Sequence, residues 1–479
     1  MILDNWLAKR AETCPDRTAL VADGMRIAYA ELESEATGAA RRLAARGVRR
    51  GAVVVLELPA GAEYVVLVHA LMKLGAVAAP LNPRLAAPER AAQISALDPV
   101  LELTETGQVI GDEADFPLLG EHDLDAVHCR ILTSGTSGAG RSVGLTYGNH
   151  LWSAVGSAFR IGVDPVDRWL CCLPLHHVGG LSIPLRSVVY GTGVVMHDGF
   201  DADAVAMSLD VDGVTLLSLV PTQLVRLLDA GVDLTGPRAI LVGGGPVPVD
   251  AIEEAAGRGA TVVPTYGLTE AASQVTTLEP QEALRRLGSA GRPLLTTHLR
   301  IQDGEILVQG PTVAPGCADE DGWLHTGDLG RIDDEGFLYV EDRIGDVIIT
   351  GGENVTPAEV EEVLMRHPSV AEAAAVGRAD PEWQEAVVAT VVLRDGAAIS
   401  EDELREHCAA ELAGFKVPKR FEFVGELPRT PTDKVAKHEL RAMGDQGLTP
   451  GTWDREHAAP STRASQASAA AEATPGRTA

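Results

Sequence analysis

The sequence predicts an α/β protein with a large N-terminal domain of flanked parallel and mixed sheets, a β subdomain and a small α+β C-terminal domain. Three observations support this prediction. From residue 52 to residue 264, short apolar runs alternate with stretches of helical periodicity, which is typical of parallel sheets covered by helices. From about residue 288, short alternating strands with Gly and Asp turns follow. After residues 342–346 the pattern becomes a compact mixture of strands and helices.

The N-terminal elements follow from these periodicities in order. Before residue 50 we expect a helix, a short hairpin around Ala22-Asp23-Gly24 and a helix over 30–46. The first βα alternation predicts the strands 52–58 and 76–80 and the helices 62–74 and 88–97. The second predicts the helices 149–159, 181–190 and 221–230, and the strands 169–173, 193–196, 215–219, 239–242 and 261–264.

The remaining elements define the domain organisation. The β subdomain is expected to end near residue 341, and the C-terminal domain to contain a loop at Gly351-Gly352-Glu353-Asn354. Its other elements are the helices 357–366 and 401–412 and the β runs 370–376 and 386–393. We therefore expect an N-terminal domain over 1–344 and a C-terminal domain over 345–445. Residues 446–479 are rich in Ala, Ser, Thr, Pro and Gly, which predicts a disordered tail.

Length and charge restrict the function. The chain has 479 residues, enough for two or more domains, and a formal net charge of −28. This charge disfavours nucleic acid and anionic membranes as partners, so an anionic ligand needs a local pocket. We see no run of about 18 apolar residues and no basic, apolar leader, so we expect no membrane insertion and a cytoplasmic location. The oligomeric state stays open.

Cysteine and lysine usage adds two expectations. The six cysteines are scattered without a CxxC pair, which favours reduced thiols in a cytosol and argues against a disulfide framework or a zinc site. Only six of the 40 cationic residues are lysines. An acidic, lysine-poor chain suits a salt-rich cytoplasm, where screening reduces self-repulsion; the alternative is a drift in codon usage in a GC-rich genome.

A glycine-rich loop is the feature most suggestive of a ligand. Residues 131–141 (ILTSGTSGAGR) combine two apolar residues, four hydroxyls, three glycines and a final Arg141. Glycines let backbone N–H groups approach a ligand, rotating hydroxyls add donors, and the guanidinium adds a permanent charge. Such a concave set of donors suits a polyphosphate. The alternative is a flexible surface linker.

The same loop nearly matches a P-loop, with arginine in place of lysine at residue 141. A P-loop runs directly into a helix whose N-terminus meets the phosphates. Here residues 142–148 contain two glycines and alternating apolar residues, which predict a strand and a turn, and helical periodicity starts only near Asn149. This context argues against a P-loop.

Two clusters downstream combine residues suited to a nucleotide. Tyr266-Gly267-Leu268-Thr269-Glu270 offers an aromatic face for a purine, a hydroxyl for a phosphate and a carboxylate for Mg²⁺. Its alternative is a helix start capped by Thr269. His325-Thr326-Gly327-Asp328 places a carboxylate after a glycine, where it can accept both ribose hydroxyls. Its alternative is a simple Asx turn.

Three further segments are weaker on their own. The strand 239–242 runs into Gly243-Gly244-Gly245, and the carboxyl ends of strands in open α/β sheets line ligand crevices. Asp342-Arg343-Ile344-Gly345-Asp346 equally suits a surface turn with an ion pair. Residues 428–434 (PRTPTDK) end in Lys434, one of only six lysines. A lysine on a loop is usually just solvated.

Together and in this order, these motifs resemble the acyl-adenylate-forming superfamily of acyl-CoA synthetases, luciferases and adenylation domains. The resemblance extends over about 1–445. Within the superfamily, residues 148–158, 167–171, 174–183 and 265–277 (TYGLTEAASQVTT) look most like the o-succinylbenzoate–CoA ligases of menaquinone biosynthesis. The resemblance implies a ligase that uses ATP, Mg²⁺, CoA and a small carboxylic acid, and a C-terminal domain that is mobile.

The resemblance also implies roles for residues. Those implied for the phosphates of ATP are Thr133, Ser134, Gly135, Thr136, Ser137, Gly138 and Arg141. Those implied for adenine and ribose are Gly243, Gly244, Gly245, Tyr266, Asp328 and Arg343. Thr269 would contact the α-phosphate, Glu270 would hold Mg²⁺, and Lys434 would bridge the acyl carboxylate and the α-phosphate.

The acyl and thiol sites follow in the same way. His177 and Gly267 would border the acyl pocket, and Gly351 and Gly352 would line a tunnel for pantetheine. The alternative for His177 is a satisfied core histidine. For the carboxylate of o-succinylbenzoate that does not react, we select Arg186, on the helix that follows His176-His177, whose alternative is a surface-facing helical arginine.

Two departures from the family pattern stand out. The phosphate loop ends in Gly140-Arg141 where the family usually has Pro-Lys, so the charge is kept with a different geometry. The hinge position, often Asp or Lys, is Gly345, which can absorb a large φ/ψ change. Alternatives to the assigned activity are a CoA ligase for another acid, a free-standing adenylation enzyme, a luciferase-like oxygenase, and a nucleotide-binding regulator with a degenerate P-loop.

Overall fold

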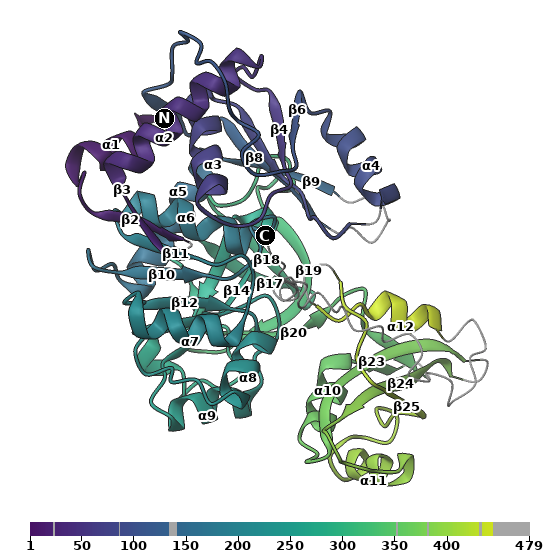
Figure 1. The fold of residues 1–479 in the computed structure, drawn as a ribbon. Coiled ribbons are helices and arrows are strands. Elements are labelled where there is room, and N and C mark those ends of the chain that lie inside the picture. The colour runs from purple at the N-terminus through teal and green to yellow at the C-terminus, as the bar shows by residue number, and fades with distance from the viewer. Residues whose placement is uncertain are drawn as a thin grey trace, which may run out of the picture.

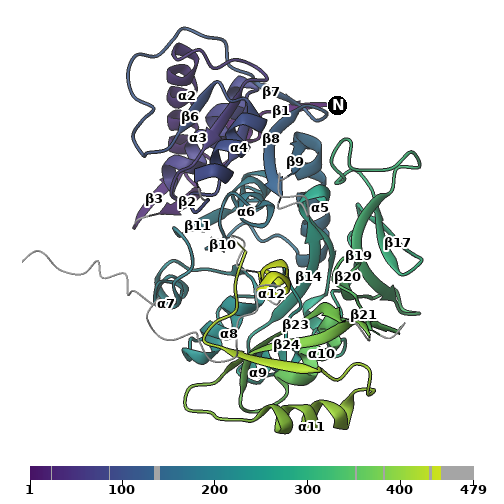
Figure 2. The same cartoon turned by 90° about the vertical axis from the view of Figure 1, so that its right-hand side faces the viewer.

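A computed structural model of the chain describes residues 1–22, 24–85, 87–133, 141–350, 353–380, 383–430 and 434–443. The N-terminal part contains two large sheets and a smaller β sheet, and the C-terminal elements form a separate lobe beside them (Figures 1 and 2). The predicted fold class is confirmed.

The larger of the two main sheets has nine strands in the order β16-β15-β14-β13-β12-β10-β11-β2-β3. Its strands are β2 (Thr18–Ala22), β3 (Met25–Ala28), β10 (Arg168–Cys171), β11 (Gly193–Met196), β12 (Leu216–Leu219), β13 (Ala239–Val242), β14 (Val262–Leu268), β15 (Ser273–Thr277) and β16 (Arg292–Pro293). The central strands from β2 to β14 are parallel, and β3, β15 and β16 join antiparallel at the edges.

The second main sheet has five strands in the order β6-β4-β5-β8-β9. These are β4 (Val53–Leu56), β5 (Val77–Pro80), β6 (Leu101–Leu103), β8 (Val127–Thr133) and β9 (Arg141–Thr146), while β1 (Ile2–Asp4) pairs with β7 (Glu121–Asp123). The helices of this region are α1 (Trp6–Thr13), α2 (Tyr29–Ala45), α3 (Ala62–Leu74), α4 (Ala87–Leu97), α5 (Tyr147–Ile161), α6 (Val178–Tyr190), α7 (Ala202–Val211), α8 (Pro221–Asp229) and α9 (Val249–Gly257).

The β subdomain and the C-terminal lobe complete the fold. The subdomain is the antiparallel sheet β17 (His298–Gln302), β18 (Glu305–Gln309), β19 (Leu324–Ile332) and β20 (Leu338–Arg343). The short 3₁₀ turns are η1 (Thr269–Ala271) and η2 (Pro280–Glu282). The lobe contains β21 (Ile348–Thr350), β22 (Glu353–Val355), β23 (Val370–Asp380), β24 (Gln384–Leu393), β25 (Arg420–Val424), α10 (Pro357–Met365), α11 (Glu401–Glu411) and α12 (Lys437–Met443).

Most predicted elements are confirmed, and several short elements were missed. The hairpin β2–β3 and the strands β5, β11 and β13 lie where their apolar runs predicted. Helix α7 was not predicted, although Asp201 caps it by accepting a hydrogen bond from the Ala204 N–H. Helices α9 and α12 and strand β25 were also missed, because short elements are stabilised mainly by packing.

One apolar core joins the two main sheets and the helices between them. Helix α2 is fixed against α6 by Tyr29, whose buried hydroxyl lies within hydrogen-bonding distance of the carbonyls of Ser187 (3.0 Å) and Thr192 (2.7 Å). A second apolar cluster covers the other face of the nine-stranded sheet with residues of α7, α8 and α9. Helices therefore cover both faces of this sheet, as the βα alternation predicted.

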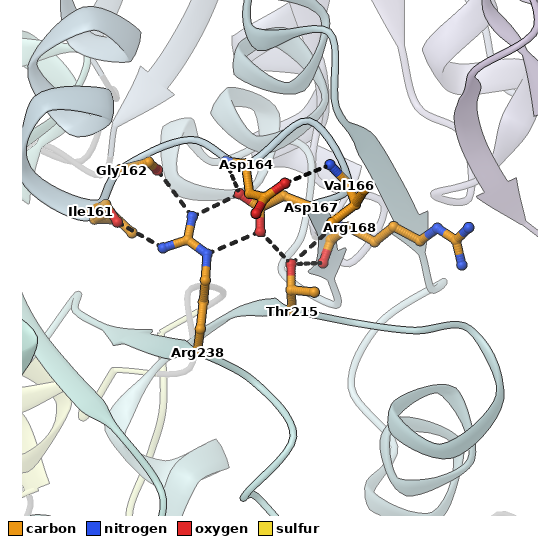
Figure 3. Close-up of polar contacts among 8 residues, drawn as sticks. All are labelled: Ile161, Gly162, Asp164, Val166, Asp167, Arg168, Thr215 and Arg238. Carbon is orange, nitrogen blue, oxygen red and sulfur yellow. Dashed lines mark hydrogen bonds and ion pairs between the residues drawn. The ribbon is translucent and has the colours of Figure 1, made fainter.

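The amino ends of the parallel strands are held together by Asp167 (Figure 3). Its carboxylate, only 3% exposed, accepts hydrogen bonds from Arg238 Nε (2.9 Å) before β13 and from Thr215 Oγ1 (2.7 Å) before β12. Arg238 also donates to the carbonyls of Ile161 and Gly162. This network fixes three strand starts on the edge opposite the strand ends that carry the glycine and tyrosine motifs.

Within the described part of the chain, all six cysteines are free thiols. None of the described helices has both the length and the apolarity needed to span a bilayer.

Replacing Asp167 by Asn should lower the free energy of unfolding by about 3 kcal/mol at pH 7, because Arg238 loses its buried partner. Burial raises the pKa of the Asp167 carboxyl, but hydrogen bonds from Arg238, Asp164 N–H and Thr215 outweigh burial and lower the pKa overall. The carboxylate thus stabilises the fold above the unfolded-state pKa of about 3.9, and this contribution is lost as the pH falls through the lower folded-state value.

Urea unfolding of the wild type and Asp167→Asn between pH 3 and pH 7 measures this effect. The difference between the two proteins should shrink toward the acid end. The exposed Asp210 on α7 offers a matched control, and Asp210→Asn should follow the wild type at every pH. A difference in the free energy of unfolding between the wild type and Asp167→Asn that stays constant from pH 3 to pH 7 would contradict the stabilising role of the ionised Asp167 carboxylate.

Candidate functional site

The Asp328 carboxylate is the point at which three parts of the chain meet. Oδ2 accepts a hydrogen bond from Tyr266 Oη at 2.7 Å, and Oδ1 lies 3.0 Å from Arg343 Nε. Tyr266 belongs to β14, while Asp328 and Arg343 face each other across β19 and β20. Burial raises the pKa of Tyr266 and the Asp328 charge raises it further, so the phenol stays protonated and donates.

The turn before Asp328 determines where its carboxylate points. Gly327 adopts φ +72°, a conformation that favours glycine, and its N–H donates to Glu305 Oε1 at 2.9 Å. Thr326 Oγ1 donates to the Ile306 carbonyl and accepts from the Asp328 N–H. The segment is therefore a side-chain-stabilised turn inside a strand, and the Asx-turn alternative is not what the structure shows.

Lys434 brings the C-terminal lobe to this point. Desolvation by the surrounding protein lowers the pKa of the Lys434 ammonium, and the positive charge of Arg343 lowers it further. The negative charge of Asp328 acts in the opposite direction and raises this pKa. Lys434 is thus within electrostatic range of both residues, although its side chain keeps contact with solvent. The Thr430 N–H donates to the Lys434 carbonyl at 2.7 Å, and the Lys434 N–H donates to Thr430 Oγ1 at 3.3 Å.

Strand β14 extends through Tyr266 to Leu268, beyond the predicted end at residue 264, because it pairs with β15. A bulge lies between Tyr266 and Gly267, and a Cβ on Gly267 would lie 1.7 Å from the Ser273 carbonyl oxygen. Only glycine fits there. At the end of β13, a Cβ on Gly243 would lie 2.7 Å from Thr265, and Gly244 adopts φ +85°. The two strand ends thus lie against each other.

Thr269 and Glu270 begin the 3₁₀ turn η1 directly after β14. The N-cap position belongs to Leu268, so the alternative of a helix capped by Thr269 is wrong. The Glu270 carbonyl accepts the Ala314 N–H at 2.8 Å. Among the ion pairs that the described residues form, none involves the Glu270 carboxylate, which is half-buried. A hard oxygen ligand in this position fits Mg²⁺.

The glycine-rich loop is framed by β8 and β9. Thr133 pairs with Arg141 across this hairpin, and Thr133 Oγ1 donates to the Arg141 carbonyl at 3.2 Å. Arg141 Nη2 donates to the Gly316 carbonyl (3.2 Å) and contacts Cys317 Sγ (3.6 Å). Among the described residues after the loop, 141–146 form a strand and the next helix starts only at Tyr147, so the P-loop alternative is wrong.

His177 is the N-cap residue of α6 and is half-buried. Its ring lies 4.3 Å from that of His176, centroid to centroid, and burial lowers the pKa of His176 to about 4, with Arg84 lowering it further. The turn that leads into α6 needs Gly180, where a Cβ would lie 2.3 Å from the Pro174 carbonyl oxygen. Two imidazoles are thus held at the start of α6.

Arg186 on α6 is 3% exposed, so the alternative of a surface-facing arginine is wrong. Its guanidinium donates to Gln274 Oε1, to Ser157 Oγ and to the Ser182 carbonyl, and it stacks over Trp169 at 5.1 Å. The described residues place no carboxylate in an ion pair with it. Burial lowers the pKa of Arg186, which expresses the cost of keeping this charge away from water and without an anion.

Gln274 is a site residue that the sequence argument missed. It pairs with Gly267 across β14 and β15, and its Nε2 donates to Thr277 Oγ1 at 2.9 Å. Gln274 therefore connects the Arg186 guanidinium to the strand that carries Tyr266. The available signal was a glutamine within the apolar and hydroxyl-bearing run 271–277 (AASQVTT), because a buried amide needs partners.

The structure thus groups Tyr266, Asp328, Arg343 and Lys434, with Gly243–Gly245, Thr269 and Glu270 on adjoining strand ends. A second group contains Arg186, Gln274 and Gly267. The predicted residues Ser134, Gly135, Thr136, Ser137, Gly138, Gly351 and Gly352 lie outside the described residues. Polar and charged groups that lie together at several strand ends suit a nucleotide. The buried guanidinium of Arg186 suits a carboxylate.

Comparisons with known proteins agree with this geometry. Residues 7–317 match the family model of the AMP-binding enzymes, and residues 359–434 match that of the AMP-binding enzyme C-terminal domain. A 2-succinylbenzoate–CoA ligase of Bacillus cereus is 39% identical, covering 93% of this chain and 99% of that protein.

Two solved structures are similar over most of the chain. One is the o-succinylbenzoate CoA synthetase from Bacillus subtilis in complex with the acyl-adenylate intermediate OSB-AMP, at 37% identity and a TM-score of 0.87, covering 92% of this chain and 98% of that one. The other is the same synthetase in complex with ATP and a magnesium ion, at 37% identity and a TM-score of 0.86, covering 92% and 100%.

Proposed function

The chain belongs to the AMP-binding enzyme family, and from this premise we propose that it is an ATP-dependent acid–CoA ligase that converts o-succinylbenzoate to o-succinylbenzoyl-CoA in menaquinone biosynthesis. The observation that carries the proposal is the grouping of Tyr266, Asp328 and Arg343 with Lys434 of the C-terminal lobe. The buried Arg186, which suits a second carboxylate, supports the choice of acid.

In the first half-reaction the substrate carboxylate attacks the α-phosphorus of ATP, and the bond to pyrophosphate breaks. Asp328 and Arg343 bind the ribose, Tyr266 and Gly243–Gly245 border the adenine, and Thr269 donates to the α-phosphate. Lys434 neutralises charge between the acyl carboxylate and the α-phosphate, which is positioning and electrostatic catalysis. When bound through Glu270, Mg²⁺ supplies further neutralisation of the phosphates.

In the second half-reaction the C-terminal lobe rotates at Gly345, and Lys434 leaves the nucleotide. The loop with Gly351 and Gly352 then lines the path of pantetheine. The thiol of CoA attacks the acyl carbon, AMP leaves with the carboxylate-derived oxygen, and the thiol proton passes to solvent or to a base. His177, at the start of α6, borders the acyl pocket and the thiol entry.

The remaining assignments belong to the same proposal. Thr133 and the hydroxyls and glycines of 134–138 close over the β- and γ-phosphates, with Arg141 in place of the usual lysine. The N-terminal domain extends over 1–344 and the mobile domain over 345–445. The enzyme acts in the cytoplasm on small molecules and does not insert into a membrane, and a homo-oligomer is compatible with all of these assignments.

The activity should appear as o-succinylbenzoate-dependent release of pyrophosphate, with AMP and the CoA thioester as products. A panel of aliphatic and aromatic acids, assayed with and without CoA and with oxygen uptake recorded, distinguishes the alternatives. Turnover of another acid would redirect the substrate assignment, and thiol transfer only to a carrier protein would indicate a free-standing adenylation enzyme. Hydrolysis of ATP to ADP without any acid would refute the ligase.

Lys434→Ala should reduce acyl-AMP formation by at least about 100-fold, because an ammonium that neutralises developing charge is worth about 3–4 kcal/mol. Thioester formation from supplied acyl-AMP should change by less than threefold. Lys419→Ala, which removes an exposed ammonium from the same lobe, is the matched control and should leave both half-reactions unchanged. Equal losses in the two half-reactions would contradict the division of roles.

Arg186→Met should raise the KM for o-succinylbenzoate about 10- to 100-fold, the equivalent of losing one or two hydrogen bonds between charged groups. The KM for 4-oxo-4-phenylbutanoate, which lacks the ring carboxylate, should change by less than threefold, since that acid has no group for the guanidinium. Steady-state kinetics with both acids measures the difference. A similar rise for both acids would mean that Arg186 supports the pocket without binding the carboxylate.

A further inference from the structure

A cluster of buried histidine and cysteine side chains, residue types that can ligate a metal, lies between β8 and α5. His128 and Cys129 belong to β8, and His150 belongs to the first turn of α5. They are 1%, 0% and 4% exposed, and their ligand atoms all lie within 4.8 Å of one another. Cys129 Sγ is 3.6 Å from His150 Nε2, and the rings of His128 and His150 are 4.8 Å apart, centroid to centroid. The absence of a CxxC pair in the sequence did not reveal this cluster, because only one of its residues is a cysteine and His150 is distant in the sequence from the other two.

A β-bulge explains how two consecutive residues face the same helix. Neighbouring side chains of a regular strand point to opposite faces of the sheet. Between Val127 and Cys129 the pairing of β8 with β9 shifts by one residue, so that His128 is the extra residue. On the other side, Thr146 and Asn149 cap α5 reciprocally, which fixes the helix start and therefore the position of His150.

The imidazole of His128 is not satisfied by the fold. Neither ring nitrogen of His128 has a hydrogen-bond partner among the described residues, and the ring stacks on Tyr147 at 4.7 Å. A buried polar group without a partner costs free energy, so it calls for a reason to be retained.

We propose that His128, Cys129 and His150 form a buried, three-coordinate site for a soft d¹⁰ cation of the Cu(I) class. Thiolate and imidazole ligands select such ions. The cation replaces the proton of the Cys129 thiol, a bond forms between sulfur and metal, and the proton leaves to solvent. Ligands at about 2.0–2.3 Å from one ion lie about 3.5–4 Å apart, so the cluster needs only a small contraction.

Charge and ligand number favour a monovalent ion over Zn²⁺. Cu(I) with one thiolate and two neutral imidazoles has no net charge, whereas Zn²⁺ would leave an uncompensated positive charge in an apolar core. Structural zinc also needs a fourth ligand. The neighbouring His122 stacks on Tyr147 at 4.2 Å, so this ring separates it from His128, which also stacks on Tyr147.

The site connects elements that frame the nucleotide site. Strand β8 ends at Thr133, where the glycine-rich loop begins. Asn149, beside His150, donates to the carbonyls of Pro311 (2.9 Å) and Val313 (3.0 Å), and the next N–H, that of Ala314, donates to the Glu270 carbonyl. A bound ion would therefore fasten β8 to α5 and stabilise the scaffold on which Glu270 and the loop depend.

Anaerobic titration of the full chain with Cu(I) against a chromophoric chelator tests the proposal. The background protein carries Cys14→Ser and Cys317→Ser, which removes the two half-exposed thiols. We expect one Cu(I) per chain after incubation for hours, since a buried site loads through local opening. Cys129→Ser should lose this ion, whereas Cys172→Ser, which removes an equally buried thiol, should keep it.

X-ray absorption of the loaded background protein gives a readout that needs no variant in the cluster. One sulfur and two nitrogen neighbours of copper support the site, and so does a melting temperature that Cu(I) raises in the background but not in Cys129→Ser. The proposal fails if the background protein binds no Cu(I) or if Cys129→Ser still binds the ion. It also fails if X-ray absorption shows a set of copper neighbours other than one sulfur and two nitrogens, or if Zn²⁺ displaces Cu(I). Lys434→Ala should bind Cu(I) normally, so this result is independent of the ligase assay.

Discussion

The contact between the Asp328 carboxylate and its two partners is the interaction on which the rest of the site depends. It joins Tyr266 at the end of the parallel sheet to Arg343 at the end of the β subdomain. An acidic chain with a net charge of −28 repels a nucleotide in general. In the function that we propose, Arg343 and Lys434 are the cations that offset this repulsion; Arg343 pairs with the Asp328 carboxylate, and Lys434 interacts with it through its charge. Ligand binding is thus a local property of this junction.

Sequence periodicity predicted the sheets well, because buried parallel strands are short apolar runs such as Ala239–Val242. It failed where partners distant in sequence decide the structure. Strand β14 continues to Leu268 because β15 pairs with it and Gly267 permits the close approach. Helix α12 forms over Lys437–Met443 because Leu440 is buried in a small apolar cluster with residues of β23 and β24. No local pattern contains that information.

The site shows the same limit more sharply. Each motif alone also suited an ordinary structural role, such as a linker, a helix cap or a surface turn. Only the order of the motifs, which matches a known family, made the nucleotide assignment specific. Geometry then excluded the P-loop, the Thr269 cap and the exposed Arg186. The partner of Arg186 is Gln274, 88 residues away, and only tertiary structure brings the two together. The cluster of His128, Cys129 and His150 likewise depends on a bulge, which alternation in the sequence does not reveal.

The contacts on either side of Gly345 bear on the lobe rotation that we propose. Arg343, on the large side, is paired with Asp328, and Asp346, on the small side, is paired with Arg441 of α12. A rotation at Gly345 would leave both pairs intact, and no atom within 4 Å would obstruct even a Cβ there. The described contacts that cross this point include hydrogen bonds from the Ala358 N–H to Asp342 (3.3 Å) and from the Asp346 N–H to the Arg343 carbonyl (2.9 Å), and the charges of Lys437 and Lys434 interact across it with Asp342 and Asp328. The ion pairs on each side of Gly345 favour, for the rotation that we propose, a rigid-body movement over local unfolding.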